Sequence, residues 1–139
     1  MFKLHPRLEA ELIYIGKSDL SQVFVLPNSD NPWVVLVPEI ADIKELHHLE
    51  HKDQVKLLKE INSVSSVMEA EYTPDKINIG ALGNMVPQLH IHIIARYKKD
   101  KAWPGALWGT DAGADNQKIK DYTKFFKQAL DLNFITYRK

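Results

Sequence analysis

The sequence contains no cysteine, which excludes disulfide bonds, thiolate metal ligands and a cysteine nucleophile. Long apolar runs are also missing. No segment approaches the roughly 20 consecutive apolar residues that a membrane-spanning helix needs. The amino terminus, MFKLHPRLEAEL, has no apolar core of signal-peptide length. We therefore expect a cytoplasmic protein with no membrane partner.

An excess of either charge is absent as well, since 18 basic residues balance 18 acidic ones among 139. Such a balance gives no overall electrostatic attraction for nucleic acid, and we expect no nucleic-acid partner. A chain of this length can bury one continuous core, so we expect residues 1–139 to form a single domain. With cysteine absent, the six histidines are the main candidates for chemistry.

Short β-rich runs occupy the first part of the chain. They cover residues 12–16, 21–26 and 33–37, and polar or proline-bearing turns separate them. The connection KSDL between the first two runs is compatible with a hairpin. These patterns predict an antiparallel meander of three strands.

The period then changes to that of a helix. Apolar residues recur at three- and four-residue steps between residues 51 and 72, as Val55, Leu58, Ile61, Val64 and Met68. Residues 76–80 and 88–96 follow as strands, and residues 96–114, rich in Gly, Pro and Trp, form a predicted ordered loop. A last helix is predicted over residues 115–132. The fold class is therefore α+β, with a mainly antiparallel sheet covered by a long amphipathic helix.

The stretch QLHIHIIAR carries the most informative pattern. Side chains alternate between the two faces of a strand, so Gln88, His90 and His92 are expected on one face. The opposite, aliphatic face would anchor the strand in the core, through Leu89, Ile91 and Ile93.

Nearby residues suggest that the polar face is a site. Asn78 lies one strand back, a glycine-bearing turn at residues 83–87 leads in, and Arg96 closes the strand. A glycine turn lets backbone N–H groups approach an anion, and imidazoles supply a nucleophile and a donor, which suits a phosphate. Two alternatives remain open here: solvated strand histidines, or a His-x-His metal site that would need a third ligand for zinc.

The segment GNMVPQLHIHIIAR resembles the signature of the histidine-triad (HIT) superfamily of nucleotidyl hydrolases and transferases. His90 and His92 match the second and third histidines of that signature, whereas Gln88 stands in place of the first. The likeness extends over most of residues 21–96. AWPGALWG is similar to a bacterial branch described as diadenosine-tetraphosphate-hydrolase-like, which also tends to carry glutamine there.

The resemblance implies a five-stranded antiparallel sheet with a long helix and a C-terminal helix, a symmetric homodimer, and a purine nucleotide or dinucleoside polyphosphate as ligand. It implies that His90 attacks the α-phosphorus and that His92 donates to a phosphate oxygen. Gln88 would occupy a catalytic position without exchanging a proton as imidazole does. The implied nucleotide- and phosphate-binding residues are Asn78, Gly83, Asn84, Met85, Val86 and Arg96.

The implied function is hydrolysis of a nucleoside phosphoanhydride or phosphoramidate at the α-phosphate, through a nucleotidyl-histidine intermediate. The alternative is a non-catalytic purine nucleotide sensor on the same scaffold, because the substituted triad weakens acid–base support around His90. We expect no cofactor and no bound metal. For Arg96, an ion pair that anchors the strand end is an equal alternative to phosphate binding.

Other conspicuous residues receive structural interpretations. We expect Trp33 to pack in the core, and Trp103 and Trp108 to fold their loop over the site or against a partner subunit. A short helical turn is predicted at residues 43–46, capped by Asp42. The histidines near the start of the long helix are expected to face solvent, and they are His47, His48 and His51. Candidate walls of a base pocket are Phe2, Leu4, Phe24, Leu26 and Trp33.

Overall fold

The strands and helices follow the predicted order, with one additional helix. The computed structural model describes residues 1–110, 113 and 115–133. The strands are β1 (Ile13–Lys17), β2 (Ser21–Val25), β3 (Trp33–Pro38), β4 (Lys76–Gly80) and β5 (Ile91–Arg96). The helices are α1 (Pro6–Glu11), α2 (His51–Tyr72) and α3 (Asn116–Asn133), with a 3-10 turn η1 (Leu46–His48).

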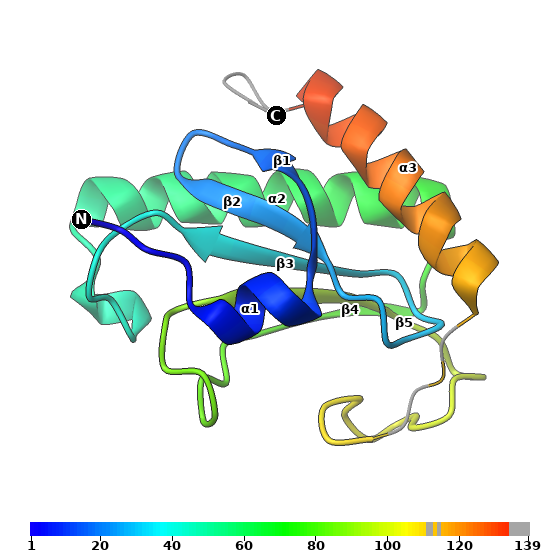
Figure 1. The fold of residues 1–139 in the computed structure, drawn as a ribbon. Helices are drawn as coiled ribbons and strands as arrows, with labels where there is room; N and C mark the ends of the chain where they lie inside the picture. Colours follow the sequence, from blue (N-terminus) through cyan, green and yellow to red (C-terminus); the bar gives the residue numbers. More distant parts are fainter. Residues whose placement is uncertain (111–112, 114, 134–139) are drawn as a thin grey trace.

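The five strands form one antiparallel sheet in the order β1-β2-β3-β5-β4. The long helix α2 runs along one face of this sheet, while α1 and the loop after β5 lie on the other side (Figure 1). Hydrophobic clusters fill both spaces, one beneath α2 and α3 and one beneath α1 and the loop. The predicted α+β class, with its five-stranded sheet and two main helices, is confirmed.

The stripe by which α2 packs on the sheet differs from the predicted one. Its buried apolar side chains are Leu57, Ile61, Val64 and Met68, at the steps of an amphipathic helix. Val55 and Leu58 were expected in this stripe, but they are 40% and 58% exposed. Both lie off the line through the four buried residues. The predicted stripe therefore included two apolar residues that do not pack on the sheet.

Helix α1 was not predicted. It is only six residues long and buries one side chain, Leu8, so it leaves no apolar period in the sequence. Its start is nevertheless locally encoded. Pro6 occupies the first turn, and His5 Nδ1 accepts a hydrogen bond from the backbone N–H of Arg7 at 3.1 Å. This helix places two charged residues beside the site described below.

The segment before α2 corrects a second expectation. The helical turn lies at Leu46–His48 rather than at residues 43–46, and Glu45, not Asp42, is its N-cap. Asp42 instead adopts a left-handed backbone conformation with φ of 61°. The histidines near α2 are exposed as expected, and they are His47, His48 and His51. The first residue of the predicted loop, Arg96, is the last residue of β5, and residues 97–110 contain neither helix nor strand. Residues 111, 112 and 114 of this loop lie outside the described residues.

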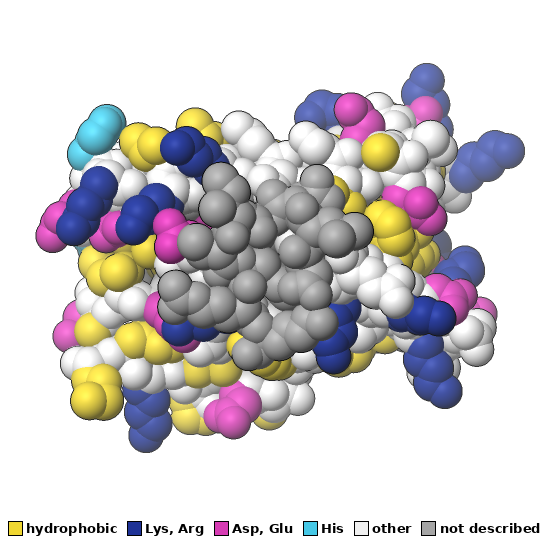
Figure 2. Space-filling view, turned by 90° about the horizontal axis from the view of Figure 1, so that it is seen from above, with side chains coloured by type: hydrophobic (Ala, Val, Ile, Leu, Met, Phe, Trp, Pro, Cys, Tyr) yellow, Lys and Arg dark blue, Asp and Glu magenta, His cyan; other side chains and the backbone are white. Residues whose placement is uncertain are grey.

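Charged side chains of both signs are interspersed on the face of the molecule seen in Figure 2, in keeping with the balanced composition. Within the described part of the chain, no helix is both long and apolar enough to cross a membrane.

Candidate active site

His90 and His92 meet on the face of the sheet that α2 does not cover. His92 lies in β5 opposite Val35 of β3, and His90 immediately precedes β5. Both are only 8% exposed, with ring centroids 5.0 Å apart. They line a pocket of about 460 Å³. The remaining lining residues are Arg7, Glu11, Leu26, Asn28, Trp33, Leu82, Gly83, Asn84, Met85, Val86, Leu107, Trp108, Gly109 and Thr110.

The hydrogen bond of His90 defines which of its nitrogens can react. Nδ1 lies 2.7 Å from the backbone carbonyl oxygen of Gln88. A carbonyl oxygen only accepts hydrogen bonds, so Nδ1 carries the proton and the neutral ring keeps its lone pair on Nε2. This is the arrangement that a histidine nucleophile requires, with one nitrogen held and the other free.

His92 has the opposite tautomer. The indole Nε1–H of Trp33 donates to Nδ1 of His92 at 2.9 Å, and indole nitrogen is a donor only. The proton of the neutral ring therefore lies on Nε2. Burial, and then the neighbouring charge of His90, lowers the pKa of His92 from 6.5 to about 4. Near pH 7 His92 is thus a neutral donor, and Trp33 directs this donor as well as packing in the core.

Trp108 packs against the rings of His92 and Trp33 at the pocket. Its ring contacts His92 edge-on at 5.7 Å between centroids and Trp33 at 6.0 Å. Gly80 makes room for it, because a Cβ atom there would lie 3.1 Å from Cη2 of Trp108. The expectation that this loop folds over the site is thereby met for Trp108. Trp103 lies instead against the guanidinium of Arg96, 5.7 Å from its ring centroid.

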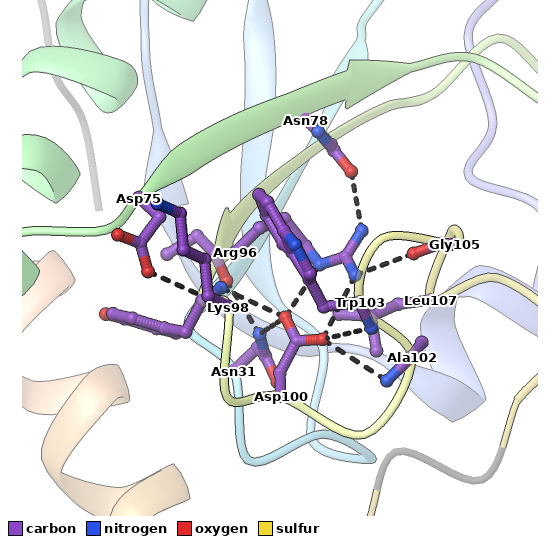
Figure 3. Close-up of polar contacts among 12 residues, drawn as sticks. Asn31, Asp75, Asn78, Arg96, Lys98, Asp100, Ala102, Trp103, Gly105 and Leu107 are labelled. Atoms are coloured by element: carbon purple, nitrogen blue, oxygen red, sulfur yellow. Dashed lines mark hydrogen bonds and ion pairs between the residues drawn. The ribbon is translucent and has the colours of Figure 1, made fainter.

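Arg96 anchors the start of this loop through the polar contacts drawn in Figure 3. Its side chain is 2% exposed, and it forms a two-pronged ion pair with Asp100, at 2.9 Å from Nε and 3.1 Å from Nη2. Nη2 also donates to the carbonyl oxygen of Gly105 at 2.7 Å. Arg96 is not among the pocket-lining residues, so of the two predicted roles the anchoring ion pair is the one seen.

Asp100 is the second half of the anchor. Its carboxylate accepts hydrogen bonds from the backbone N–H groups of Tyr97, Ala102 and Trp103 and from the side chain of Asn31. The hydrogen bonds from Arg96 hold the pKa of Asp100 well below its usual range. One buried ion pair therefore shapes the start of the loop that carries Trp108.

Asn78 belongs to the same network rather than to the pocket lining. Its Oδ1 accepts a hydrogen bond from Nη1 of Arg96 at 2.7 Å. The amide is thus oriented, and its Nδ2 end has no side-chain or backbone partner among the described residues.

The aliphatic face of this stretch is as predicted, since Leu89, Ile91 and Ile93 lie in the core cluster beneath α2, but the side chain of Gln88 does not line the pocket. The side chain instead bonds to the amino-terminal segment. Oε1 accepts from the N–H of His5 at 2.9 Å, and Nε2 donates to the carbonyl oxygen of Lys3 at 2.9 Å.

The glycine turn does reach the pocket. Gly83, Asn84, Met85 and Val86 all line it. Gly83 has φ of +68°, a conformation that glycine adopts without a steric penalty. The structure therefore brings these four predicted residues together with His90 and His92. It leaves three predicted residues outside the pocket lining, namely Gln88, Asn78 and Arg96.

Several lining residues were missed by sequence reasoning. Arg7 and Glu11 come from the unpredicted helix α1, and nothing in the sequence links that helix to residues some 80 positions away. Of the candidate base-pocket walls, Leu26 and Trp33 line the pocket. Phe24 is buried in the hydrophobic cluster on this face, and Phe2 and Leu4 pack against it.

Metal binding was one of the open alternatives for the histidine pair. Among the residues that the structure describes, no group of three or more His, Cys, Asp or Glu side chains is arranged to hold a metal ion.

A protein-family model and several solved structures match this chain. A HIT domain family model matches residues 7–99. A histidine triad protein from Bradyrhizobium japonicum is 39% identical over 96% of this chain and 98% of its own, with a TM-score of 0.84. Histidine triad proteins from Marinobacter aquaeolei and Sinorhizobium meliloti have the same coverage, identities of 38% and 39%, and TM-scores of 0.88 and 0.85. No curated protein sequence matches significantly.

Proposed function

Because this chain belongs to the HIT domain family, whose members are generally nucleotide hydrolases or transferases, we propose that it cleaves a nucleoside phosphoanhydride or phosphoramidate at the α-phosphate. The substrate class that we favour is the dinucleoside polyphosphates, as in the diadenosine-tetraphosphate-hydrolase-like branch. Residues 1–139 act in this proposal as one purine-nucleotide-binding domain in the cytoplasm.

The observation that carries this proposal is the hydrogen bond from His90 Nδ1 to the Gln88 carbonyl. It leaves Nε2 of His90 as a nucleophile. Nε2 attacks the α-phosphorus, a nitrogen–phosphorus bond forms, and the bond to the leaving group breaks with its electron pair. Water then attacks the same phosphorus, the nitrogen–phosphorus bond breaks with its electron pair returning to Nε2, and the water gives up a proton to solvent as the nucleotide leaves.

His92 and the glycine turn stabilise the charge that develops on the phosphoryl oxygens. The Nε2–H of His92 is the donor, fixed by Trp33. Backbone N–H groups of residues 83–86 add further donors at the edge of the pocket. Donors that are positioned before the reaction act most strongly where water is excluded, and both histidines are only 8% exposed, with Trp108 against His92.

The test is intact-protein mass spectrometry after brief exposure to diadenosine tetraphosphate or adenosine phosphoramidate, with acid-labile adducts preserved and AMP assayed alongside. We expect an adenylyl adduct, or AMP formation, that is lost in His90→Ala. His48→Ala is the matched control, because His48 is an exposed histidine outside the pocket. Unchanged hydrolysis in folded His90→Ala would remove His90 from the nucleophile role.

A nucleotide sensor is the second candidate, and the position of Gln88 favours it. With residue 88 bonded to Lys3 and His5, the position of the first triad histidine contributes no proton donor to the pocket lining. Purine nucleotide binding without adduct or product would support the sensor.

We also propose that the protein is a homodimer. The outer edge of β4 has no neighbouring strand in the described part of the chain, and Ile79 on this strand is 51% exposed. An uncovered edge with apolar side chains is suited to pairing with a second copy.

A further inference from the structure

The amide of Gln88 holds the amino-terminal strap, residues 1–5. It contacts the carbonyl oxygen of Lys3 and the N–H of His5, the two backbone groups that flank Leu4. A neighbouring strand offers one donor and one acceptor to such a pair of groups, and a primary amide offers the same combination. Gln88 thus substitutes for a strand neighbour and ties the strap to the segment that enters β5.

The strap in turn fixes helix α1. His5, held through its N–H by Gln88, caps α1 by accepting from the N–H of Arg7. Leu8, buried at 5% exposure, anchors the helix in the cluster beneath it. A continuous chain of contacts therefore runs from Gln88 to the side chains that α1 presents to the pocket, Arg7 and Glu11.

Arg7 lines the pocket with guanidinium N–H groups that form no hydrogen bond within the described part of the chain. Its Nε bonds to Oε1 of Glu11 at 2.8 Å, whereas Nη1 and Nη2 have no partner among the described residues. In the described lining, Arg7 is the one lysine or arginine. His92 is neutral near pH 7. Paired guanidinium N–H groups suit phosphate or carboxylate oxygens, which they bind in two-pronged fashion.

We propose that Arg7 binds an anionic leaving group of the nucleotidyl transfer, and that Gln88 is a positioning residue that holds α1 for this purpose. This inference rests on the proposed function and narrows it to substrates whose departing part carries negative charge. Gln88 then acts on substrate selection through α1 and takes no part in proton transfer.

The experiment compares two substrates that share the adenylyl group. Diadenosine tetraphosphate loses an anionic nucleotide, and adenosine phosphoramidate loses ammonia. We expect Arg7→Gln to lower kcat/KM for the tetraphosphate about tenfold more than for the phosphoramidate. A factor of about ten is what the loss of one hydrogen bond to a charged group produces. Glu9→Gln is the control on the same helix, since Glu9 does not line this pocket, and it should leave both rates unchanged.

Gln88→Met keeps the side-chain volume but removes both hydrogen bonds. We expect it to reproduce the selectivity of Arg7→Gln, mainly through a higher KM for the tetraphosphate, and to speed hydrogen exchange of the His5 amide. A residue that acted only in proton transfer would lower kcat for both substrates and leave that exchange unchanged, which would overturn the proposal. Equal losses of kcat/KM on both substrates in Arg7→Gln would also overturn it.

Failure of the proposed function gives a different result. If the wild-type protein turns over neither substrate, calorimetric affinities for diadenosine tetraphosphate and AMP replace the rates. If Arg7→Gln loses more affinity for the tetraphosphate than for AMP, the anion contact at Arg7 is still supported. If the substitution changes both affinities by the same factor, or changes neither, that contact is overturned. A protein that binds neither nucleotide overturns both proposals.

Discussion

His90 and His92, separated by one residue, carry their protons on opposite ring nitrogens, and their hydrogen-bond partners account for the difference. The carbonyl of Gln88 requires a proton on Nδ1 of His90, whereas the indole of Trp33 requires a lone pair on Nδ1 of His92. The sequence pattern HIH does not reveal which nitrogen of each ring carries the proton, because the fold determines which group lies next to each ring. Trp33 was expected only to pack in the core, and its second role became visible through its distance to His92.

This contact gives a prediction about the pKa of His92. In Trp33→Phe the ring loses the donor that favours its neutral form, so the pKa of His92 should rise above about 4. Histidine resonances followed by NMR across a pH titration measure this shift, with exposed His48 as an internal reference. An unchanged or lower pKa for His92 would contradict the assigned hydrogen bond.

The same group makes stability depend on pH. His92 binds its proton at about 4 in the folded protein but near 6.5 when unfolded, so between these values the unfolded chain binds more protons. The stability that neutral His92 contributes is fully present above pH 6.5, the unfolded pKa, and is lost as the pH falls from there to about 4. Trp33→Phe should weaken this dependence, because it brings the two pKa values closer together.

At the scale of elements, the loop after β5 owes its shape to one buried ion pair. Asp100→Asn keeps the side-chain shape but leaves the guanidinium of Arg96 without its counter-charge. We expect a loss of about 3–5 kcal/mol in the free energy of unfolding, measured by urea denaturation. Asp19→Asn is the control, since its half-exposed pair with Lys56 at 3.9 Å should matter by less than about 1 kcal/mol. Similar losses in both variants would refute this role.

Elements with a strong period were predictable from sequence. Helix α2 and strand β4 have the predicted bounds, because charged residues, Pro74 and β-rich composition mark their ends. Helix α1 was not predictable, since one buried leucine in six residues leaves no period. The bonding of Gln88 to the amino-terminal strap was not predictable either, since its partners His5 and Lys3 lie 83 and 85 positions away in the sequence.

For the whole molecule, the sheet has two unequal sides: α2 and α3 close one of them (Figure 1), and the pocket lies on the other. The uncovered edge of β4 leads to a prediction about assembly. Ile79→Lys should shift the protein from dimer toward monomer in sedimentation velocity at a fixed concentration. Tyr14→Lys, at a 49% exposed position on the opposite edge strand β1, should not. A wild-type protein that sediments as a monomer would refute the dimer.

The anchor of Arg96, Asp100 and Asn78 also has an evolutionary consequence. Loss of Arg96 or Asp100 leaves the other charge buried without its ion-pair partner, and loss of Asn78 removes the side-chain acceptor of Arg96 Nη1. Lineages that change one position should therefore change the others in concert. We expect positions 78, 96 and 100 to covary among homologues, while the exposed positions of the α2 surface drift independently.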